Sequence, residues 1–102
     1  ANSMNSKHDP KYKELHRAAD EVLHYIWDPI GISNIPQARD EYHGYLPHVL
    51  GLLQSGGTQE QIASYLSNII STRMELSENS AHDLEVAELL VNWREYIDDK
   101  FA

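Results

Sequence analysis

Apolar residues recur every three or four positions along most of this chain, which is the spacing of one face of an α-helix. The pattern divides the sequence into four segments, at about residues 10–27, 36–54, 58–74 and 80–98. Sustained alternation of apolar and polar residues, which is typical of a half-buried strand, does not occur. The links between the segments are short and favour antiparallel neighbours. The sequence therefore predicts an all-α fold, a compact four-helix bundle.

Each segment has an expected core face, defined by its apolar positions. The four faces are Tyr12, Leu15, Ala19, Val22, Leu23 and Ile26; then Ala38, Tyr42, Tyr45, Leu46, Val49, Leu52 and Leu53; then Ile62, Tyr65, Leu66, Ile69 and Ile70; and last Val86, Leu89, Leu90, Trp93 and Ile97.

Local signals mark the helix starts. Asp9-Pro10 is typical of an N-cap followed by the first helical position. Thr58 and Gln61 fit a capping box, in which each residue bonds the backbone of the other. Ser80 and Asp83 fit a similar N-terminal cap. These signals predict starts for three of the four helices.

Prolines interrupt the helical pattern at two places. Pro29 disfavours the α conformation of the residue before it and so ends the first helix. Pro47 removes a hydrogen bond inside the second segment, so we expect a kink or a split near residues 43–47. The link over residues 28–36 is rich in isoleucine, and we expect it to be ordered and to lie over the core. Its isoleucines are Ile30, Ile32 and Ile35.

The length of 102 residues corresponds to one domain. We expect a disordered tail at residues 1–8, of which 1–3 read as a vector remnant, and a single helical domain at residues 9–102. No signal peptide is visible, and the apolar runs are too short to span a bilayer. A cytoplasmic location is therefore expected.

Charge and cysteine content narrow the classes of function. Eight basic and sixteen acidic residues give a net charge of −8, which disfavours nucleic acid and anionic membranes as partners and favours a basic protein surface. The absence of cysteine excludes disulfides, thiol catalysis and cysteine-based metal sites. The sequence indicates no cofactor.

One side of the first helix carries His16, Asp20 and His24 at spacings of four residues. Two imidazoles and a carboxylate are suitable zinc ligands. Asp20 and His24 rotate progressively away from the apolar stripe, however, so the favoured interpretation is a solvated flank, with a metal site as the alternative.

Two stretches are candidates for binding a partner. The string Trp27-Asp28-Pro29-Ile30-Gly31 has a local use in a turn and in the core, and its functional interpretation is a ligand or partner surface. Tyrosines at helical spacing and an acidic pair offer a second surface. The candidate partner-binding residues are Trp27, Asp28, Ile30, Asp40, Glu41, Tyr42 and Tyr45.

The same string, followed by Ala38-Arg39-Asp40-Glu41-Tyr42 and later by Leu52-Leu53, resembles a group of small uncharacterised bacterial helical proteins. These proteins carry a W-D-P-aliphatic/aromatic-G motif after their first helix. The resemblance spans about residues 12–97. It implies a bacterial origin and a helical fold, and it transfers no activity and no catalytic residue.

No nucleophile elbow, P-loop, dinucleotide-binding or zinc-protease motif is present. We therefore expect a non-enzymatic protein-binding module, in one version an acidic immunity or antitoxin-like protein that neutralises a basic partner. The alternatives are a metal- or ligand-binding enzyme using His16, Asp20 and His24, and a homo-oligomeric structural protein that pairs through leftover apolar faces.

Overall fold

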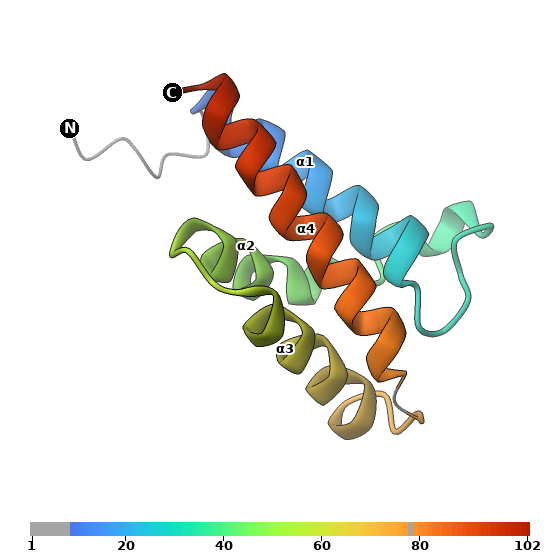
Figure 1. The fold of residues 1–102 in the computed structure, drawn as a ribbon. Coiled ribbons are helices and arrows are strands. Elements are labelled where there is room, and N and C mark those ends of the chain that lie inside the picture. The colour runs from blue at the N-terminus through green and yellow to red at the C-terminus, as the bar shows by residue number, and fades with distance from the viewer. Residues whose placement is uncertain (1–8, 78) are drawn as a thin grey trace.

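The computed structural model describes residues 9–77 and 79–102, which form four α-helices and, within these ranges, no strand. Helices α1 and α4 lie side by side and antiparallel, and α2 and α3 cover one side of this pair (Figure 1). The all-α prediction is confirmed, whereas the predicted tail at residues 1–8 lies outside the described residues. The helices are α1 (Pro10–Val22), α2 (Leu46–Gln54), α3 (Gln59–Thr72) and α4 (Ser80–Lys100).

Two of the three predicted caps are confirmed. The Asp9 carboxylate accepts a hydrogen bond from the Lys11 amide at 3.1 Å, and Thr58 and Gln61 form both bonds of the capping box. The predicted cap at Ser80 is wrong. Asn79 caps α4 instead, because its side-chain oxygen accepts from the His82 amide at 3.2 Å, while the Asp83 side chain has partners elsewhere.

A single π-helical turn, Leu23–Trp27, extends α1. Its wider turn rotates the following side chains relative to an α-helix. Trp27 thereby enters the core and is 1% exposed, whereas Ile26, predicted to lie on the core face, is 46% exposed. His82 Nε2 donates to the carbonyls of Ile26 and Trp27 at 2.9 and 3.2 Å and so ties this turn to α4. Asp28, in the left-handed conformation, ends the helix where the sequence predicted.

The second predicted helix is confirmed only from Leu46 onward. The stretch before it contains two isolated 3-10 turns, Pro36–Ala38 and His43–Tyr45, so a helix over residues 36–45 was a wrong prediction. The interruption predicted near residues 43–47 is the start of α2, since Pro47 lies in the first turn of this helix, where its missing N–H would have no partner in the helix.

The link over residues 28–36 is ordered mainly by polar bonds. The Asp28 carboxylate accepts from the amides of Ile32 and Ser33 at 2.8 and 3.1 Å. Ile32 packs against the core, as predicted for the whole link, but Ile30 and Ile35 are exposed. A carboxylate that organises its own turn, rather than apolar burial, therefore fixes this link.

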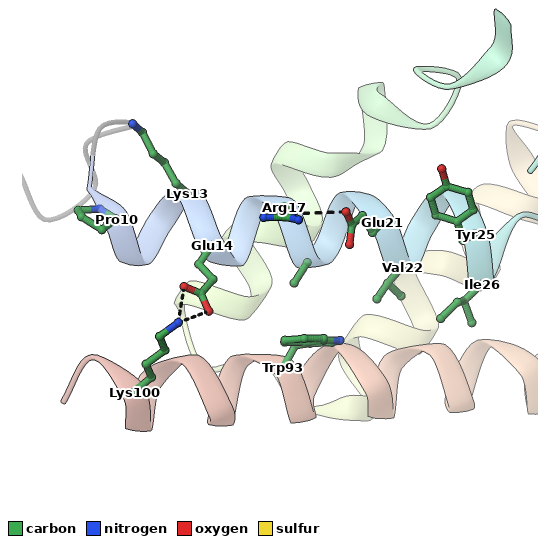
Figure 2. Close-up of a pocket in the computed structure, with 11 residues that line it drawn as sticks. Pro10, Lys13, Glu14, Arg17, Glu21, Val22, Tyr25, Ile26, Trp93 and Lys100 are labelled. Atoms are coloured by element: carbon green, nitrogen blue, oxygen red, sulfur yellow. Dashed lines mark hydrogen bonds and ion pairs between the residues drawn. The ribbon is translucent and has the colours of Figure 1, made fainter. Parts of the chain in front are cut away.

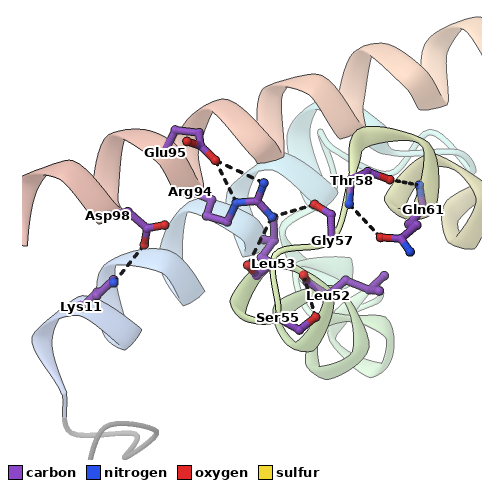
Figure 3. A network of polar contacts seen from close by, with 10 residues as sticks. All are labelled: Lys11, Leu52, Leu53, Ser55, Gly57, Thr58, Gln61, Arg94, Glu95 and Asp98. Atoms are coloured by element: carbon purple, nitrogen blue, oxygen red, sulfur yellow. Dashed lines mark hydrogen bonds and ion pairs between the residues drawn. The ribbon is translucent and has the colours of Figure 1, made fainter. Parts of the chain in front are cut away.

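The end of α2 is joined to α4 by a largely buried arginine (Figure 3). Arg94 Nη1 donates to the carbonyls of Leu53 and Gly57 at 3.3 and 2.7 Å. On the same side of α4, Lys11 of α1 forms an ion pair with Asp98 at 3.0 Å. These contacts hold α2 and the α2–α3 link on one side of the α1/α4 pair.

Candidate functional site

A buried polar cluster connects the π-helical turn to α3 and α4. Asp83 is fully buried, accepting from Trp27 Nε1 at 3.1 Å through Oδ1 and from the Ser67 hydroxyl at 2.7 Å through Oδ2. Both oxygens of this carboxyl group therefore join elements that are far apart in the sequence. Sequence reasoning missed this role because Ser80 and Asp83 also fit a local capping pattern.

Three of the candidate partner-binding residues belong to a structural network. The Tyr42 hydroxyl donates to Asp28 Oδ1 at 2.8 Å and accepts from the Ile30 amide at 3.2 Å. The buried Tyr42 ring lies 5.3 Å from the Trp27 ring, and Tyr45 packs edge-on against Trp27 at 6.2 Å. Burial, together with the hydrogen bond to the nearby carboxylate, raises the pKa of Tyr42. Trp27 and Tyr42 are thus core residues.

Of the other candidates, three lie on the outside of the 28–45 segment, and Tyr45 packs against the core. Ile30, Asp40 and Glu41 are exposed, and Tyr45 is half-buried. The structure does not gather these residues into one concave surface with Trp27 and Tyr42.

The three candidate metal ligands of α1 and its π-turn have separate surroundings. Asp20 accepts two hydrogen bonds from Arg39, at 3.0 and 3.1 Å, and one from His43 Nε2 at 3.0 Å. Although burial raises the pKa of Asp20, the hydrogen bonds and charges of these two partners outweigh it, and the pKa lies below its ordinary value. His16 is half-buried, with its ring 6.0 Å from that of Tyr12.

His24 was predicted to lie on a solvated flank, but it is only 2% exposed. One turn earlier on the same flank, the 28–45 segment brings Arg39 and His43 to Asp20. His24 Nδ1 has no hydrogen-bond partner among the described residues. Within residues 9–77 and 79–102, no three His, Asp or Glu side chains are grouped so that they could hold a metal ion.

A groove of about 810 Å³ runs between α1 and α4 on the side away from α2 and α3 (Figure 2). Its apolar wall is formed by Ala18 and Val22 of α1, by Tyr25 and Ile26 of the π-turn, and by Trp93 of α4. Figure 2 shows the Trp93 ring lying between the two helices, with Tyr25 and Ile26 toward one end of the groove.

The charged side chains of this groove are mostly paired with one another. Lys100 Nζ donates to both oxygens of Glu14 at 3.0 Å, which links the two helices at the other end (Figure 2). Arg17 pairs with Glu21 along α1 at 3.5 Å. Trp93 therefore lies in an apolar stretch bounded by ion pairs.

Trp93 was predicted to be in the core, but it is 38% exposed, and Tyr96 beside it is 57% exposed. The two rings meet edge to face at 5.9 Å. Together with Leu89 they line a second hollow, of about 470 Å³, directly beside the groove. Leu89, Trp93 and Tyr96 of α4, with Tyr25 and Ile26, form what we call the apolar face.

Carboxylates border the apolar face along α4. Glu85 precedes Leu89 by four positions and Asp99 follows Tyr96 by three, so each lies next to an apolar side chain on the helix surface. We call Glu85, Glu88 and Asp99 the acidic strip. All three are exposed, and within the described part of the chain none of them forms an ion pair.

No protein-family model matches the chain, and neither the curated proteins nor the solved structures compared with it gave a match. The resemblance to bacterial proteins with the W-D-P motif thus stays a prediction. Among the described residues, no helix has the length and apolar character needed to cross a membrane.

Proposed function

We propose that this protein is a non-enzymatic protein-binding module, of the kind represented by acidic immunity and antitoxin proteins, that binds a basic partner through its apolar face and acidic strip. The observation that carries this proposal is the exposure of Trp93 and Tyr96 beside carboxylates of the same helix that form no ion pair with the described residues.

The composition of the surface supports a binding role. Large aromatic side chains contribute much contact area at little conformational cost, and they are enriched where proteins meet. Here Trp93 and Tyr96 lie together, partly exposed, and Trp93 lines the same groove as the exposed Tyr25 and Ile26. Contiguous exposed apolar surface of this kind is typical of an interaction site.

The charge of the molecule supports a basic partner. A net charge of −8 attracts a positively charged protein from a distance, and such attraction raises the association rate. The acidic strip then offers carboxylates at the rim of the apolar face. The proposal includes a cytoplasmic location. Disulfides are rare in the cytoplasm, and the absence of cysteine from this sequence is compatible with that compartment.

Hydrogen bonding within the fold supports a non-enzymatic role. The carboxylates of Asp20, Asp28 and Asp83 accept hydrogen bonds from Arg39, Tyr42 and Trp27, and each of these bonds joins separate parts of the chain. The bonds of these three carboxylates are those of a scaffold.

Site-specific photo-crosslinking in the organism of origin tests the proposal. A photoreactive phenylalanine analogue replaces Tyr96 in one version of the full chain and Ser64, an exposed residue of α3, in the matched control. We expect a protein rich in lysine and arginine to be captured from position 96 and not from position 64. The purified partner must then bind the unmodified chain and lose affinity in the double variant Glu85→Lys/Glu88→Lys.

Other outcomes contradict the proposal. Capture of a second copy of this chain from position 96 would make the apolar face a self-association surface. Equal capture from positions 96 and 64, or a partner whose binding is unaffected by charge reversal at Glu85 and Glu88, would remove the assigned site.

A further inference from the structure

We infer that the segment of the partner that binds here is a basic amphipathic α-helix, which lies lengthwise in the groove between α1 and α4. This inference rests on the proposed function and adds the secondary structure, the orientation and the charge pattern of what is bound.

The shape of the groove fits a helix. The groove is lined from Pro10 and Lys100 at one end to Tyr25 and Ile26 at the other, and its two walls are antiparallel helices. At 1.5 Å per residue, the rise from position 10 to position 26 is roughly 24 Å, which is the length of a helix of about 16 residues. A third helix can pack into the groove of such a pair by the ordinary interlocking of side-chain ridges.

The backbone of the partner also favours a helix. An extended segment gains most of its affinity by pairing its N–H and C=O groups with an open strand edge. Residues 9–77 and 79–102 offer no strand, so an extended segment covering the apolar face would leave backbone groups facing Trp93 and Ile26 without partners. A helix satisfies these groups internally and presents only side chains.

The apolar residues of α4 on this face, the half-buried Leu89 and the exposed Trp93 and Tyr96, have the spacing of a helix-binding ridge. Leu89, Trp93 and Tyr96 lie at positions i, i+4 and i+7 of α4 and therefore form one line along its surface. An amphipathic helix with its own apolar residues at this spacing can interlock with the line over two turns.

The charges around the groove set the orientation of the helix about its axis. On the α4 side the acidic strip is unpaired within the described residues, whereas on the α1 side Arg17 pairs with Glu21 and Lys13 adds a positive charge. Basic residues of the partner helix therefore belong on the flank that faces α4. Reversing charges on that flank of the site must weaken binding more than reversing charges elsewhere.

A synthetic peptide tests this inference on the full chain. The probe is an amphipathic leucine–lysine helix of about 18 residues, long enough to span the groove. Three control peptides are compared with it. The first has the same leucine and lysine content in an order without an apolar stripe, and the second has glutamate in place of lysine. The third has a proline-rich basic sequence. Binding is followed by the fluorescence of Trp93, which is exposed, against the buried Trp27. The variant Trp93→Phe identifies the signal that belongs to Trp93.

We expect the leucine–lysine helix to shift the emission to shorter wavelength, and the shift to be absent in Trp93→Phe. The double variant Glu85→Lys/Glu88→Lys should weaken binding at least about tenfold. The matched control Asp40→Lys/Glu41→Lys changes the net charge by the same amount on the 28–45 segment and should alter the affinity less than about threefold. Circular dichroism confirms that each variant is folded.

Equal binding of the stripe-free or glutamate peptide, stronger binding of the proline-rich peptide, or equal weakening by the two double variants would overturn the inference. If position 96 captures a basic partner while the amphipathic helix does not bind, the inference fails and the proposed function stands. If position 96 captures no basic partner, the proposed function itself fails.

Discussion

At the scale of single residues, Asp83 joins the π-helical turn, α3 and α4 through its two carboxyl oxygens. The substitution Asp83→Ala leaves the Trp27 indole N–H and the Ser67 hydroxyl without an acceptor in a buried site. Since each buried unsatisfied group costs about 1–3 kcal/mol, the free energy of unfolding should fall by at least about 2 kcal/mol. Urea unfolding followed by circular dichroism measures this loss.

The matched control is Asp99→Ala, which removes an exposed carboxylate of the same helix. It should change the free energy of unfolding by less than about 0.5 kcal/mol. If the two alanine variants prove equally stable, the Asp83 cluster contributes nothing to stability.

The carboxyl group of Asp28 makes the free energy of unfolding depend on pH. Although burial raises its pKa, hydrogen bonds from the Ile32 amide, the Tyr42 hydroxyl and the Ser33 amide outweigh this effect, and the pKa lies below its ordinary value. A carboxylate whose pKa is lower in the folded than in the unfolded state stabilises the fold above its unfolded pKa, and this contribution is lost as the pH falls through the folded value.

The variant Asp28→Asn tests this dependence, because asparagine tolerates the left-handed backbone and does not titrate. Between about pH 5 and pH 2, the wild-type free energy of unfolding should fall more steeply than that of the variant. Urea midpoints at a series of pH values give the two slopes. Parallel slopes would show that Asp28 is not a source of acid sensitivity.

Residues whose partners lie nearby in the sequence could be predicted, and those with distant partners could not. Asp9 and Thr58 cap helices through bonds that span two or three residues. Trp27 and Asp83 are 56 positions apart, so no local pattern indicates their bond. The W-D-P motif singled out Trp27 and Asp28 as candidates. Trp93 was assigned to the core instead, because its helical phase places it beside Leu90 and Ile97, which are buried.

At the scale of elements, the link between α2 and α3 depends on a glycine. A Cβ atom at position 57 would lie 2.8 Å from the backbone oxygen of Leu52, and Gly57 also supplies the carbonyl that accepts from Arg94. The substitution Gly57→Ala should therefore lower the free energy of unfolding by about 1–3 kcal/mol, since the close contact is with backbone and must be relieved by shifting the link.

Gly51 provides the opposite case within α2. A Cβ atom there would have no neighbour within 4 Å, and the position is inside a helix and exposed. Gly51→Ala should raise the free energy of unfolding by about 0.5–1 kcal/mol, because alanine has the higher helix propensity. Thermal and urea unfolding of both variants check the signs, and a loss of stability in Gly51→Ala would contradict the local structure described for α2.

The four helices were predictable as elements because each buries an apolar stripe of helical period. The stretch over residues 36–45 was not, because its apolar residues fit a helix and its structure is set by tertiary bonds. Arg39 and His43 reach Asp20, and Tyr42 reaches Asp28. These bonds, together with Gly44 and Pro47, replace the first turns of the expected helix with two short 3-10 turns.

At the scale of the whole molecule, the fold is asymmetric. Helices α2 and α3 cover one side of the α1/α4 pair, and the groove on the other side is lined by residues of α1, the π-turn and α4 alone. The sequence predicted four apolar stripes that pack against one another, but it could not indicate that the described residues would leave one side of the pair uncovered. The apolar face is the consequence of this arrangement.

Because the net charge is −8, added salt should raise the stability of the fold and slow its association with a basic partner. Folding brings sixteen acidic and eight basic side chains closer together, so the excess negative charge repels itself in the folded state more than in the expanded unfolded state. Raising NaCl from about 20 to about 300 mM shortens the screening length and should increase the free energy of unfolding by about 0.5–1 kcal/mol.

The same change should slow association with a basic partner at least about tenfold, because it screens the long-range attraction. Urea unfolding and stopped-flow binding at matched salt concentrations measure both effects. A fold that loses stability in salt would show that ion pairs such as Lys11 with Asp98 outweigh the repulsion, and a rate insensitive to salt would separate the partner from the charge of this surface.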